Sequence, residues 1–372
     1  LPNDLPAELD HSFVGEGEIP FLKIIDTVRS KRALADIPNT SSADGRGGVR
    51  LTPHPALTPD LSKLPFPARD LVDQSRYRLD NISNQLYVGK ARSTSKTMQT
   101  SRGCRYKCTF CVVNQKPRFC DAALVVDEME MLEKKYGADY VLIIDPLCMY
   151  DRPRMFRICK EYRRRGLKIR WGCDARVNCI TPDLLAAMDS AGCHDLSFGI
   201  ESGVQRLLDN VKKGVKISAV EKTVRMVKRN SGILVGGLFI LGLPGETLED
   251  SLETIAFAKS LPLDMAQFSI LTPYPGSAIF DELSARGELD TGIRPGGRLD
   301  TSVWKRYSAY ISFTKNDPIW VAAGRSAAEI KSLQKRAQRE FFLRPSMILK
   351  HLKRVRPDNV LKMLNIARRA FV

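Results

Sequence analysis

Three cysteines stand close together in one short polar stretch of the chain, at Cys104, Cys108 and Cys111. Thiolates are the usual ligands of iron-sulfur clusters, and a cubane cluster contains four irons. Three cysteines would leave one iron without a protein ligand, and a small molecule with an amine beside a carboxylate could chelate that iron, much as catalytic metal sites keep one position open. The spacing therefore predicts a 4Fe-4S cluster with one reactive corner. Gly103 would let the loop turn closely around the cluster, and Phe110 would shield it from water.

Two other interpretations of these cysteines stay open. A zinc site could take Cys120 as a fourth ligand, although zinc sites favour paired CxxC knuckles. Three reduced core thiols without a metal are the other alternative, although buried thiols have no reason to gather in a loop rich in Arg and Lys. The cysteines outside the motif are interpreted as ordinary core or loop thiols: Cys120, Cys148, Cys159, Cys173, Cys179 and Cys193.

The elements that must position this loop follow from the hydrophobic pattern. From about residue 95, short apolar runs alternate with longer helical patterns, which is typical of βα units that build a parallel sheet. Strands are predicted at 96–101, 139–145, 168–173, 194–200, 233–240 and 265–271, and helices at 126–136, 152–165, 181–191 and 247–260. Six units predict an α/β fold, either an open barrel or a doubly wound sheet. In both, ligands gather at the carboxyl ends of the strands, where the cysteine loop falls.

The loops after later strands carry further motifs. They read GIESG at 199–203, GLFILGLPGE at 237–246 and TPYPG at 272–276. Together with CxxxCxxC after the first strand, preceded by Arg102-Gly103, this order resembles the branch of the radical S-adenosylmethionine (SAM) superfamily that commonly carries an N-terminal cobalamin-binding domain. The match covers roughly residues 95 to 285. The resemblance implies a partial (β/α)6 TIM-like barrel.

The resemblance also implies contacts to SAM. Asp145 is similar to the acid that holds the methionine ammonium, although Pro146 stands where the branch often has a second acid. Arg176 could pair with the SAM carboxylate, a task suited to the forked guanidinium. For Arg176 and for Glu201, an ordinary ion pair is the alternative. The remaining predicted contacts are Glu201 and Ser202 at the ribose hydroxyls, and Gly237, Gly242 and the backbone of Phe239 and Ile240 at the adenine.

The resemblance implies an enzyme that reductively cleaves SAM to a 5'-deoxyadenosyl radical. The cofactors would be a 4Fe-4S cluster, SAM and cobalamin, and the reaction on a small-molecule substrate would be cobalamin-dependent methyl transfer or ring rearrangement at an unactivated carbon. A one-electron donor such as flavodoxin or ferredoxin is the expected partner. The alternatives are a radical SAM methylthiotransferase or other RNA-modifying enzyme, and a non-catalytic zinc-binding protein.

The domain organisation is predicted as four segments. Residues 1–29 are similar to the end of a Rossmann-like cobalamin-binding domain, and 30–94, rich in proline, are predicted to be a linker. Residues 95–300 form the radical SAM core, and 301–372 form a basic helical extension. An edge strand and cap is the alternative for the first segment. Because the chain opens at Leu1 rather than Met, we expect that it lacks an upstream part.

Charge and cysteine usage limit the location and partners. The net charge is +16, and residues 301–372 hold 16 Lys and Arg against four acids. This basic region predicts a peripheral contact with anionic lipid or an acidic partner, with a solvated helical face as the alternative; a nucleic-acid partner is not expected. Nine cysteines at irregular spacings, without a secretion signal, favour a reducing compartment, and we expect the cytoplasm. The longest apolar stretch, 233–243, is far shorter than the roughly 20 residues of a membrane helix.

Overall fold

The computed structural model describes residues 11–13, 15–31, 37, 40–43, 49–52, 57–58, 60–76, 94–113, 115–292 and 300–352. The chain divides into two compact units. The smaller unit comprises residues 1–63 with 293–300, and the larger unit comprises residues 64–292 with 301–372. All the residues predicted to bind the cluster or SAM belong to the larger unit.

The smaller unit contains a three-stranded antiparallel sheet and one helix. The sheet has the order β1 (His11–Phe13), β2 (Thr40–Ala43) and β3 (Val49–Leu51), and α1 (Glu18–Arg29) follows β1. The buried Thr52 hydroxyl donates to the carbonyl of Ile37 at 2.7 Å and accepts from the Thr40 amide at 3.0 Å. These bonds stabilise paired strands within the stretch that the proline content had predicted to be a linker. A Rossmann-like domain is built on parallel strands, which the described part of this unit does not contain.

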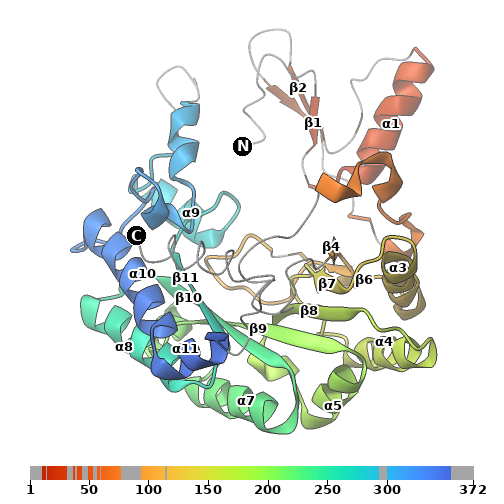
Figure 1. Cartoon of the computed structure of the whole chain (residues 1–372). Coiled ribbons are helices and arrows are strands. Elements are labelled where there is room, and N and C mark those ends of the chain that lie inside the picture. The colour runs from red at the N-terminus through yellow and green to blue at the C-terminus, as the bar shows by residue number, and fades with distance from the viewer. Residues whose placement is uncertain are drawn as a thin grey trace. The chain divides into compact units, whose positions relative to one another are not determined.

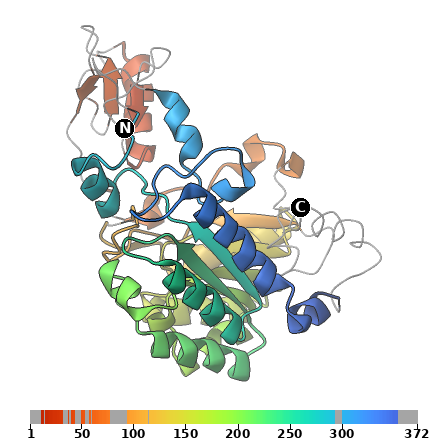
Figure 2. The same ribbon diagram turned by 90° about the vertical axis from the view of Figure 1, so that its left-hand side faces the viewer.

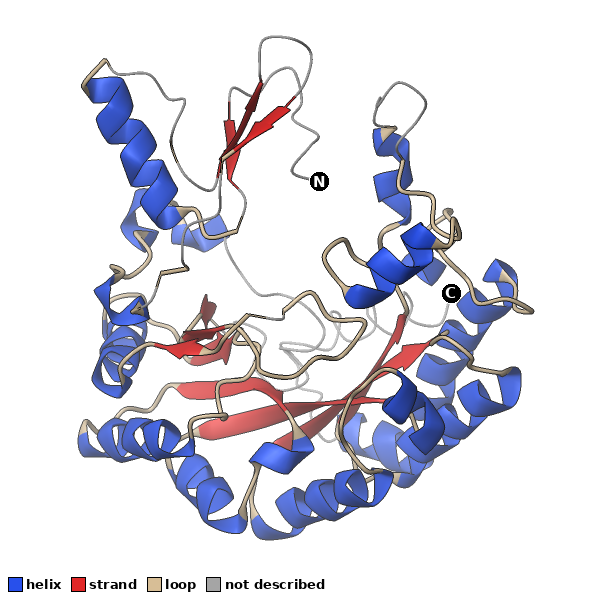
Figure 3. Ribbon diagram, turned by 180° about the vertical axis from the view of Figure 1, so that it is seen from behind, coloured by secondary structure: helices blue, strands red, loops and turns tan. Residues whose placement is uncertain are grey.

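The larger unit is built on a six-stranded sheet whose neighbouring strands are all parallel. The order is β4 (Ser95–Met98), β7 (Tyr140–Ile143), β8 (Arg170–Ala175), β9 (Cys193–Glu201), β10 (Leu234–Leu241) and β11 (Met265–Ile270). The connecting helices are α3 (Ala122–Lys134), α4 (Arg152–Arg164), α5 (Pro182–Ser190), α6 (Gln205–Asn210), α7 (Ile217–Asn230) and α8 (Leu248–Ser260), and α9 (Ala278–Ala285) follows the last strand. The sheet curls with the helices along its outer side (Figures 1 and 3). The predicted partial (β/α)6 barrel is confirmed.

Local interactions explain where most of the helices and strands begin and end, including the two main differences from the predicted boundaries. The side chain of Thr247 accepts from the Asp250 amide and Asp250 accepts from the Thr247 amide, a capping box that starts α8 as predicted. Helix α3 begins four residues earlier than predicted, because Asp121 caps it by accepting from the Ala123 amide. Strand β4 ends at Met98 instead of residue 101, because the chain turns there into a separate two-stranded ribbon.

The apolar core lies between the sheet and its helices. Along β8, Trp171, Cys173 and Ala175 belong to this core, whereas the alternate residues Gly172 and Asp174 face the inner, concave side. The outward-facing residues of the other strands, such as Val141, Leu196 and Phe268, pack in the same core. The outer face of the sheet is therefore covered by helices, and side chains that could contact a ligand lie on the inner face.

The C-terminal region packs on the same sheet. After the short turns η6 (Thr301–Arg306) and η7 (Ile311–Phe313), α10 (Ala327–Phe342) packs against β11 and α8, and α11 (Pro345–Leu352) follows (Figure 2). The buried amide of Gln334 donates to the Phe268 carbonyl at 2.7 Å and to the Ala309 carbonyl at 2.8 Å. Among the described residues, no helix combines the length and hydrophobicity needed to cross a membrane.

Candidate functional site

The cysteine loop is closed at its base by a short ribbon. Strand β5 (Ser101–Arg102) pairs with β6 (Arg118–Phe119), and the Cys104 amide donates to the Gln115 carbonyl at 2.9 Å. Gly103 has φ +82°, and a Cβ atom there would lie 2.5 Å from the Lys116 carbonyl oxygen. Both the backbone conformation and the space therefore require glycine immediately before the first cysteine.

The tip of the loop is tied to the rest of the barrel. The Thr109 amide donates to the Val211 carbonyl at 3.1 Å, and the Thr109 carbonyl accepts from the Ile279 amide at 3.0 Å. The Cys111 amide donates to the Cys108 carbonyl at 3.1 Å, so the residues on either side of Thr109 form a tight turn. The three thiols are thus carried by a loop whose backbone is held on both sides.

The donor set fits an iron-sulfur cluster. Cys104, Cys108 and Cys111 are free and partly exposed. Burial raises the pKa of the Cys111 thiol, and the neighbouring Cys108 and Cys104 raise it further. No three His, Cys, Asp or Glu side chains in the described ranges converge on one ion position, as a zinc site requires. A cubane takes each cysteine on a separate iron, so its three thiols need to share one loop and do not need to converge on a single ion.

Arg176 lies beside the cysteine loop, at the end of β8. Its guanidinium carbon is 3.6 Å from the centre of the Tyr106 ring, and its Nη1 is 3.7 Å from the Cys108 sulfur. Its Nη2 donates to the Lys213 carbonyl, while its buried Nε has no partner among the described residues. The guanidinium is therefore fixed by stacking and still has an unused N–H.

Glu201 is paired with a lysine that the sequence analysis did not identify. The Lys213 ammonium lies 2.5 Å from the Glu201 carboxylate, and both residues are buried. Gly199 makes room for this pair, because a Cβ there would lie 2.7 Å from the carboxylate and 2.8 Å from the ammonium. The Lys213 ammonium is also 6.0 Å from the centre of the Phe110 ring. In the sequence, Lys213 follows another lysine and looks like ordinary surface charge, so no local signal marks it.

Asp145 and Ser202 are engaged in supporting bonds. Asp145 accepts from the Thr100 amide and hydroxyl, both at 2.5 Å, and from the Ser101 hydroxyl at 2.7 Å. Burial raises the pKa of Asp145, while these donors act in the opposite direction. The Ser202 hydroxyl is 3.0 Å from that of Thr254 and accepts from the Val204 amide. Direct contacts of Asp145 and Ser202 with SAM stay predictions.

Part of the predicted adenine-binding segment of β10 packs in the hydrophobic core. Packing favours glycine at Gly237, since a Cβ there would lie 2.7 Å from a methyl group of Leu263 and 2.8 Å from the Phe239 ring. The Phe239 side chain is buried and stacks on Phe268 with ring centres 5.1 Å apart, so only its backbone can face a ligand. Ile240 is half-buried, and Gly242 ends the strand with φ +81°. A register shift between β9 and β10, with Ile200 as the extra residue of β9, pairs Phe239 with Glu201 and brings this segment beside the Glu201 site.

The structure thus joins some predicted residues and separates others. Cys108, Arg176, Glu201 and Phe110 are connected through Lys213. Asp145 and Ser202 lie in hydrogen-bond networks of their own. The mouth of the barrel therefore presents a thiol loop, a fixed guanidinium and a buried ion pair together.

Comparison with known proteins shows the family of the chain. The profile described as the radical SAM superfamily matches residues 98–258. An uncharacterised methyltransferase of Pyrococcus horikoshii is 30% identical over 342 residues, covering 91% of this chain and 68% of the relative. The anaerobic magnesium-protoporphyrin IX monomethyl ester cyclase of Rubrivivax gelatinosus is 30% identical over 283 residues, covering 74% of this chain and 49% of the relative.

The fold has a counterpart among solved structures. The radical SAM methyltransferase TsrM of Kitasatospora setae, solved with cobalamin and a [4Fe-4S] cluster bound, superposes with a TM-score of 0.64 at 19% identity. The superposition covers 95% of this chain and 69% of that protein. At this identity, the likeness concerns the fold.

Proposed function

The chain belongs to the radical SAM superfamily, and we propose that it generates a 5'-deoxyadenosyl radical from SAM and uses it on an unactivated carbon of a small molecule. When bound, the 4Fe-4S cluster supplies the electron that breaks the bond between the SAM sulfonium and the ribose. The observation that carries the proposal is the three-cysteine loop at the mouth of the partial barrel, with Arg176 held 3.7 Å from the Cys108 sulfur.

In this proposal the chain's own residues bind and orient the cofactors. Cys104, Cys108 and Cys111 hold the cluster. The unused N–H of Arg176 points to a carboxylate as its partner, and the SAM carboxylate is the expected one. Glu201 accepts hydrogen bonds from the ribose hydroxyls while Lys213 balances its charge. The backbone of β10 from Phe239 to Gly242 flanks the adenine.

We propose cobalamin-dependent methyl transfer or ring formation as the reaction. This is supported by the names of the relatives, a methyltransferase and a cyclase, and by the cobalamin bound in the TsrM structure. The described residues of the smaller unit form a short antiparallel sheet that does not fit a Rossmann-like cobalamin cradle, so we derive no step through it. These findings do not favour the methylthiotransferase or zinc-protein alternatives.

The domain boundaries stay part of the proposal. Residues 1–29 would end a cobalamin-binding domain, 95–300 would be the catalytic core, and 301–372 would be an appended basic region. The stretch 30–94 would connect the first two, and strands β2 and β3 show that part of it is structured.

The test is anaerobic reconstitution with iron, sulfide, SAM and dithionite, followed by an assay for 5'-deoxyadenosine. The triple variant with alanine at Cys104, Cys108 and Cys111 is expected to bind no cluster and to form no product. Cys120→Ala is the matched control and is expected to retain iron and product, because Cys120 lies outside the motif. Product from the triple variant, or stoichiometric zinc in place of iron, would refute the proposal.

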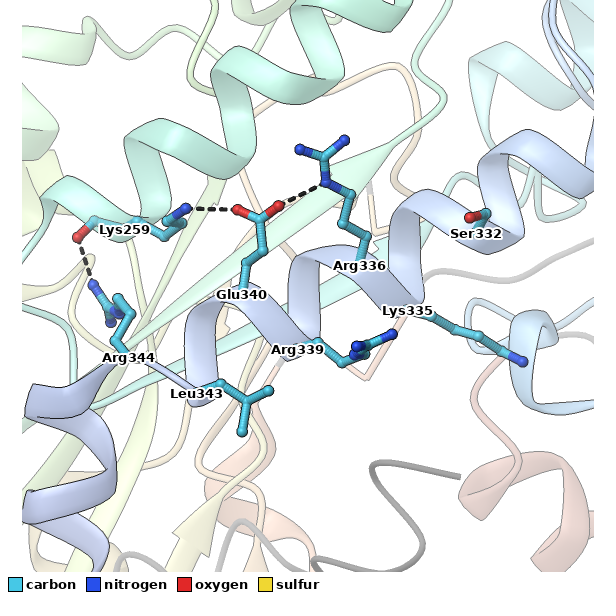
Figure 4. A pocket seen from close by; sticks show the side chains of 8 residues that line it. All are labelled: Lys259, Ser332, Lys335, Arg336, Arg339, Glu340, Leu343 and Arg344. Atoms are coloured by element: carbon cyan, nitrogen blue, oxygen red, sulfur yellow. Dashed lines mark hydrogen bonds and ion pairs between the residues drawn. The ribbon is translucent and has the colours of Figure 1, made fainter.

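We propose that the chain acts on a small molecule with the help of a reductant. We propose flavodoxin or ferredoxin as the electron donor and the cytoplasm as the location. We also propose a peripheral membrane contact through the basic face of α10. A hollow of about 710 Å³ lies there (Figure 4), lined by Lys259, Ser332, Lys335, Arg336, Arg339, Glu340, Leu343 and Arg344.

Charge and exposure on this face favour an anionic bilayer. Glu340 is paired with Lys259 and Arg336, each at 2.6 Å, whereas Lys335 and Arg339 share one helix face and have no partner among the described residues (Figure 4). Exposed aliphatic side chains follow in the chain: Leu343, Ile348 and Leu349. Cations beside exposed aliphatics are typical of surfaces that bind anionic lipid.

Vesicle sedimentation tests this contact. Binding to phosphatidylserine vesicles, but not to phosphatidylcholine vesicles, is expected for the wild type and is expected to be lost in Lys335→Glu/Arg339→Glu. Equal binding to both vesicle types, or an unaffected double variant, would contradict the membrane contact.

A further inference from the structure

The concave face of the six-stranded sheet carries exposed side chains near the carboxyl ends of its strands. Gly172 and Gly199 face it, because Cβ atoms at these positions would collide with Asp195 and Lys213. Parallel sheets are usually covered on both faces, and closed barrels fill their interior with layers of side chains. Here the inner row instead includes Ile144, which is 52% exposed, and Asp174, which is also exposed. Among the described residues, the inner side of the sheet is therefore exposed near the carboxyl ends of β7 and β8.

Asp174 differs from the other acids of this region. Asp145, Asp195 and Glu201 are all buried, and each has a hydrogen-bond donor: Thr100, Tyr140 and Lys213 respectively. In the described part of the chain, Asp174 has no hydrogen bond or ion pair, and it is exposed. It is an accessible carboxylate without a protein partner, placed inside the curve of the sheet.

The groups around Asp174 disfavour the charged form of its carboxyl group. Asp195 lies deeper, held by Tyr140 at 3.0 Å, and the Glu201–Lys213 pair lies on the side of the cysteine loop. Enclosure by protein raises the pKa of Asp174 to about 6, with Asp195 and Glu201 raising it further and Lys213 opposing them. Solvent reaches the side chain through the open concave side even though protein atoms surround it closely.

The position of Asp174 relates it to the reaction site. It lies two residues before Arg176, which contacts the cysteine loop, and it pairs with Ser197 of β9. Since Ile143 pairs with Cys173, Ile144 lies next to Asp174 in the neighbouring strand. A ligand in this place would meet an acceptor, a hydroxyl and an aliphatic side chain, one row deeper in the sheet than the residues proposed for SAM.

We infer that Asp174 binds the substrate, through an amine or hydroxyl hydrogen-bond donor placed next to an aliphatic part that contacts Ile144. This inference rests on the proposed function, because it takes the open inner face as the place where the radical meets its target. A ligand donor would supply the partner that the protein does not, and a cationic amine would also offset the neighbouring Asp195. The substrate class is therefore a small molecule with a protonated amine or hydroxyl group.

The first test measures accessibility in the full chain. Carbodiimide with glycine ethyl ester, followed by peptide mass spectrometry, is expected to modify Asp174 at least tenfold faster than Asp195. Equal rates, or no modification of Asp174, would overturn the inference. This experiment needs no variant, so it does not depend on a mutant that folds.

The second test measures ligand preference by saturation-transfer NMR, with butylammonium and pentanoate as the probes. The wild type is expected to give a stronger signal with butylammonium, and Asp174→Asn is expected to reduce that signal at least fivefold. Asp281→Asn, at an exposed position on α9, is the matched control. An unchanged signal in Asp174→Asn would overturn the inference.

Thermal unfolding separates a binding role from a structural one. Asp174→Asn is expected to keep or raise the unfolding midpoint, because it removes an unpaired carboxylate beside two other acids; a lower midpoint would identify a structural role and overturn the inference. None of these readouts requires SAM cleavage. Failure to form 5'-deoxyadenosine would therefore refute the proposed function alone, and failure of the labelling or NMR result would refute this inference alone.

Discussion

Replacing Lys213 by methionine tests the buried ion pair at the mouth of the barrel. The ammonium and the Glu201 carboxylate are 2.5 Å apart and both side chains are less than 10% exposed. At an effective dielectric constant of about 20, their attraction is on the order of 7 kcal/mol before desolvation is subtracted. Methionine would leave Glu201 buried without a partner, and breaking such a pair typically costs about 3–5 kcal/mol. We expect a loss of that size in the free energy of unfolding of the larger unit.

Urea unfolding followed by tryptophan fluorescence measures this loss. All three tryptophans, Trp171, Trp304 and Trp320, belong to the larger unit, so the signal reports that unit alone. Lys212→Met is the matched control, since Lys212 is adjacent and exposed and should change stability by about 0.5 kcal/mol at most. Adding Glu201→Gln to Lys213→Met should recover about half of the loss, because the uncompensated charge is removed. A Lys213→Met loss below about 1 kcal/mol, or a double variant no more stable than the single one, would refute the reasoning.

Three further predictions concern the loop, the guanidinium and the inner carboxylate. Gly103→Ala should prevent cluster uptake, measured as iron per chain after reconstitution, because its Cβ would lie 2.5 Å from the Lys116 carbonyl; Gly137→Ala, also at positive φ but with open space, should take up iron normally. Arg176→Lys should weaken SAM binding about tenfold, roughly 1.4 kcal/mol, because lysine lacks the planar fork; an unchanged dissociation constant measured by calorimetry would argue against the contact. Enclosure by protein atoms and the neighbouring acids raise the pKa of Asp174 from its usual 3.8 to about 6. Its contribution to stability is therefore present below pH 3.8 and is lost as the pH rises through about 6. The stability difference between wild type and Asp174→Asn should change across that window, and parallel pH profiles would show that the carboxylate titrates normally.

The hydrophobic pattern was sufficient to predict the strands of the barrel, but it did not predict where the first strand ends. All six predicted strands are present, because each parallel strand is a short apolar run bounded by helical crossovers. The end of β4 could not be predicted, since the chain turns there to give Asp145 its donors Thr100 and Ser101, 44 to 45 residues earlier. Likewise, the pairing of β1 with β2 joins residues about 30 positions apart, and β2 lies in a stretch that the sequence predicted to be a linker.

Among the site residues, spacing identified the thiols but not their neighbours. The cysteines at 104, 108 and 111 predict a cluster, because metal ligation requires particular residue types within one loop. Lys213 and Asp174 carry no such local signature. Lys213 acquires its role from Glu201, twelve residues away, and Asp174 from its position on the open face of a curved sheet.

By itself, the order of residues along the chain determined the βα alternation and the family, and it predicted the loop that would hold the cluster. Ligand type and periodicity are local properties, so they can be read without coordinates. Only the folded barrel decided which charges are paired and which are not. Burial, and the distance between residues on different strands, set the electrostatic energy of each group, and neither quantity exists until the strands are side by side.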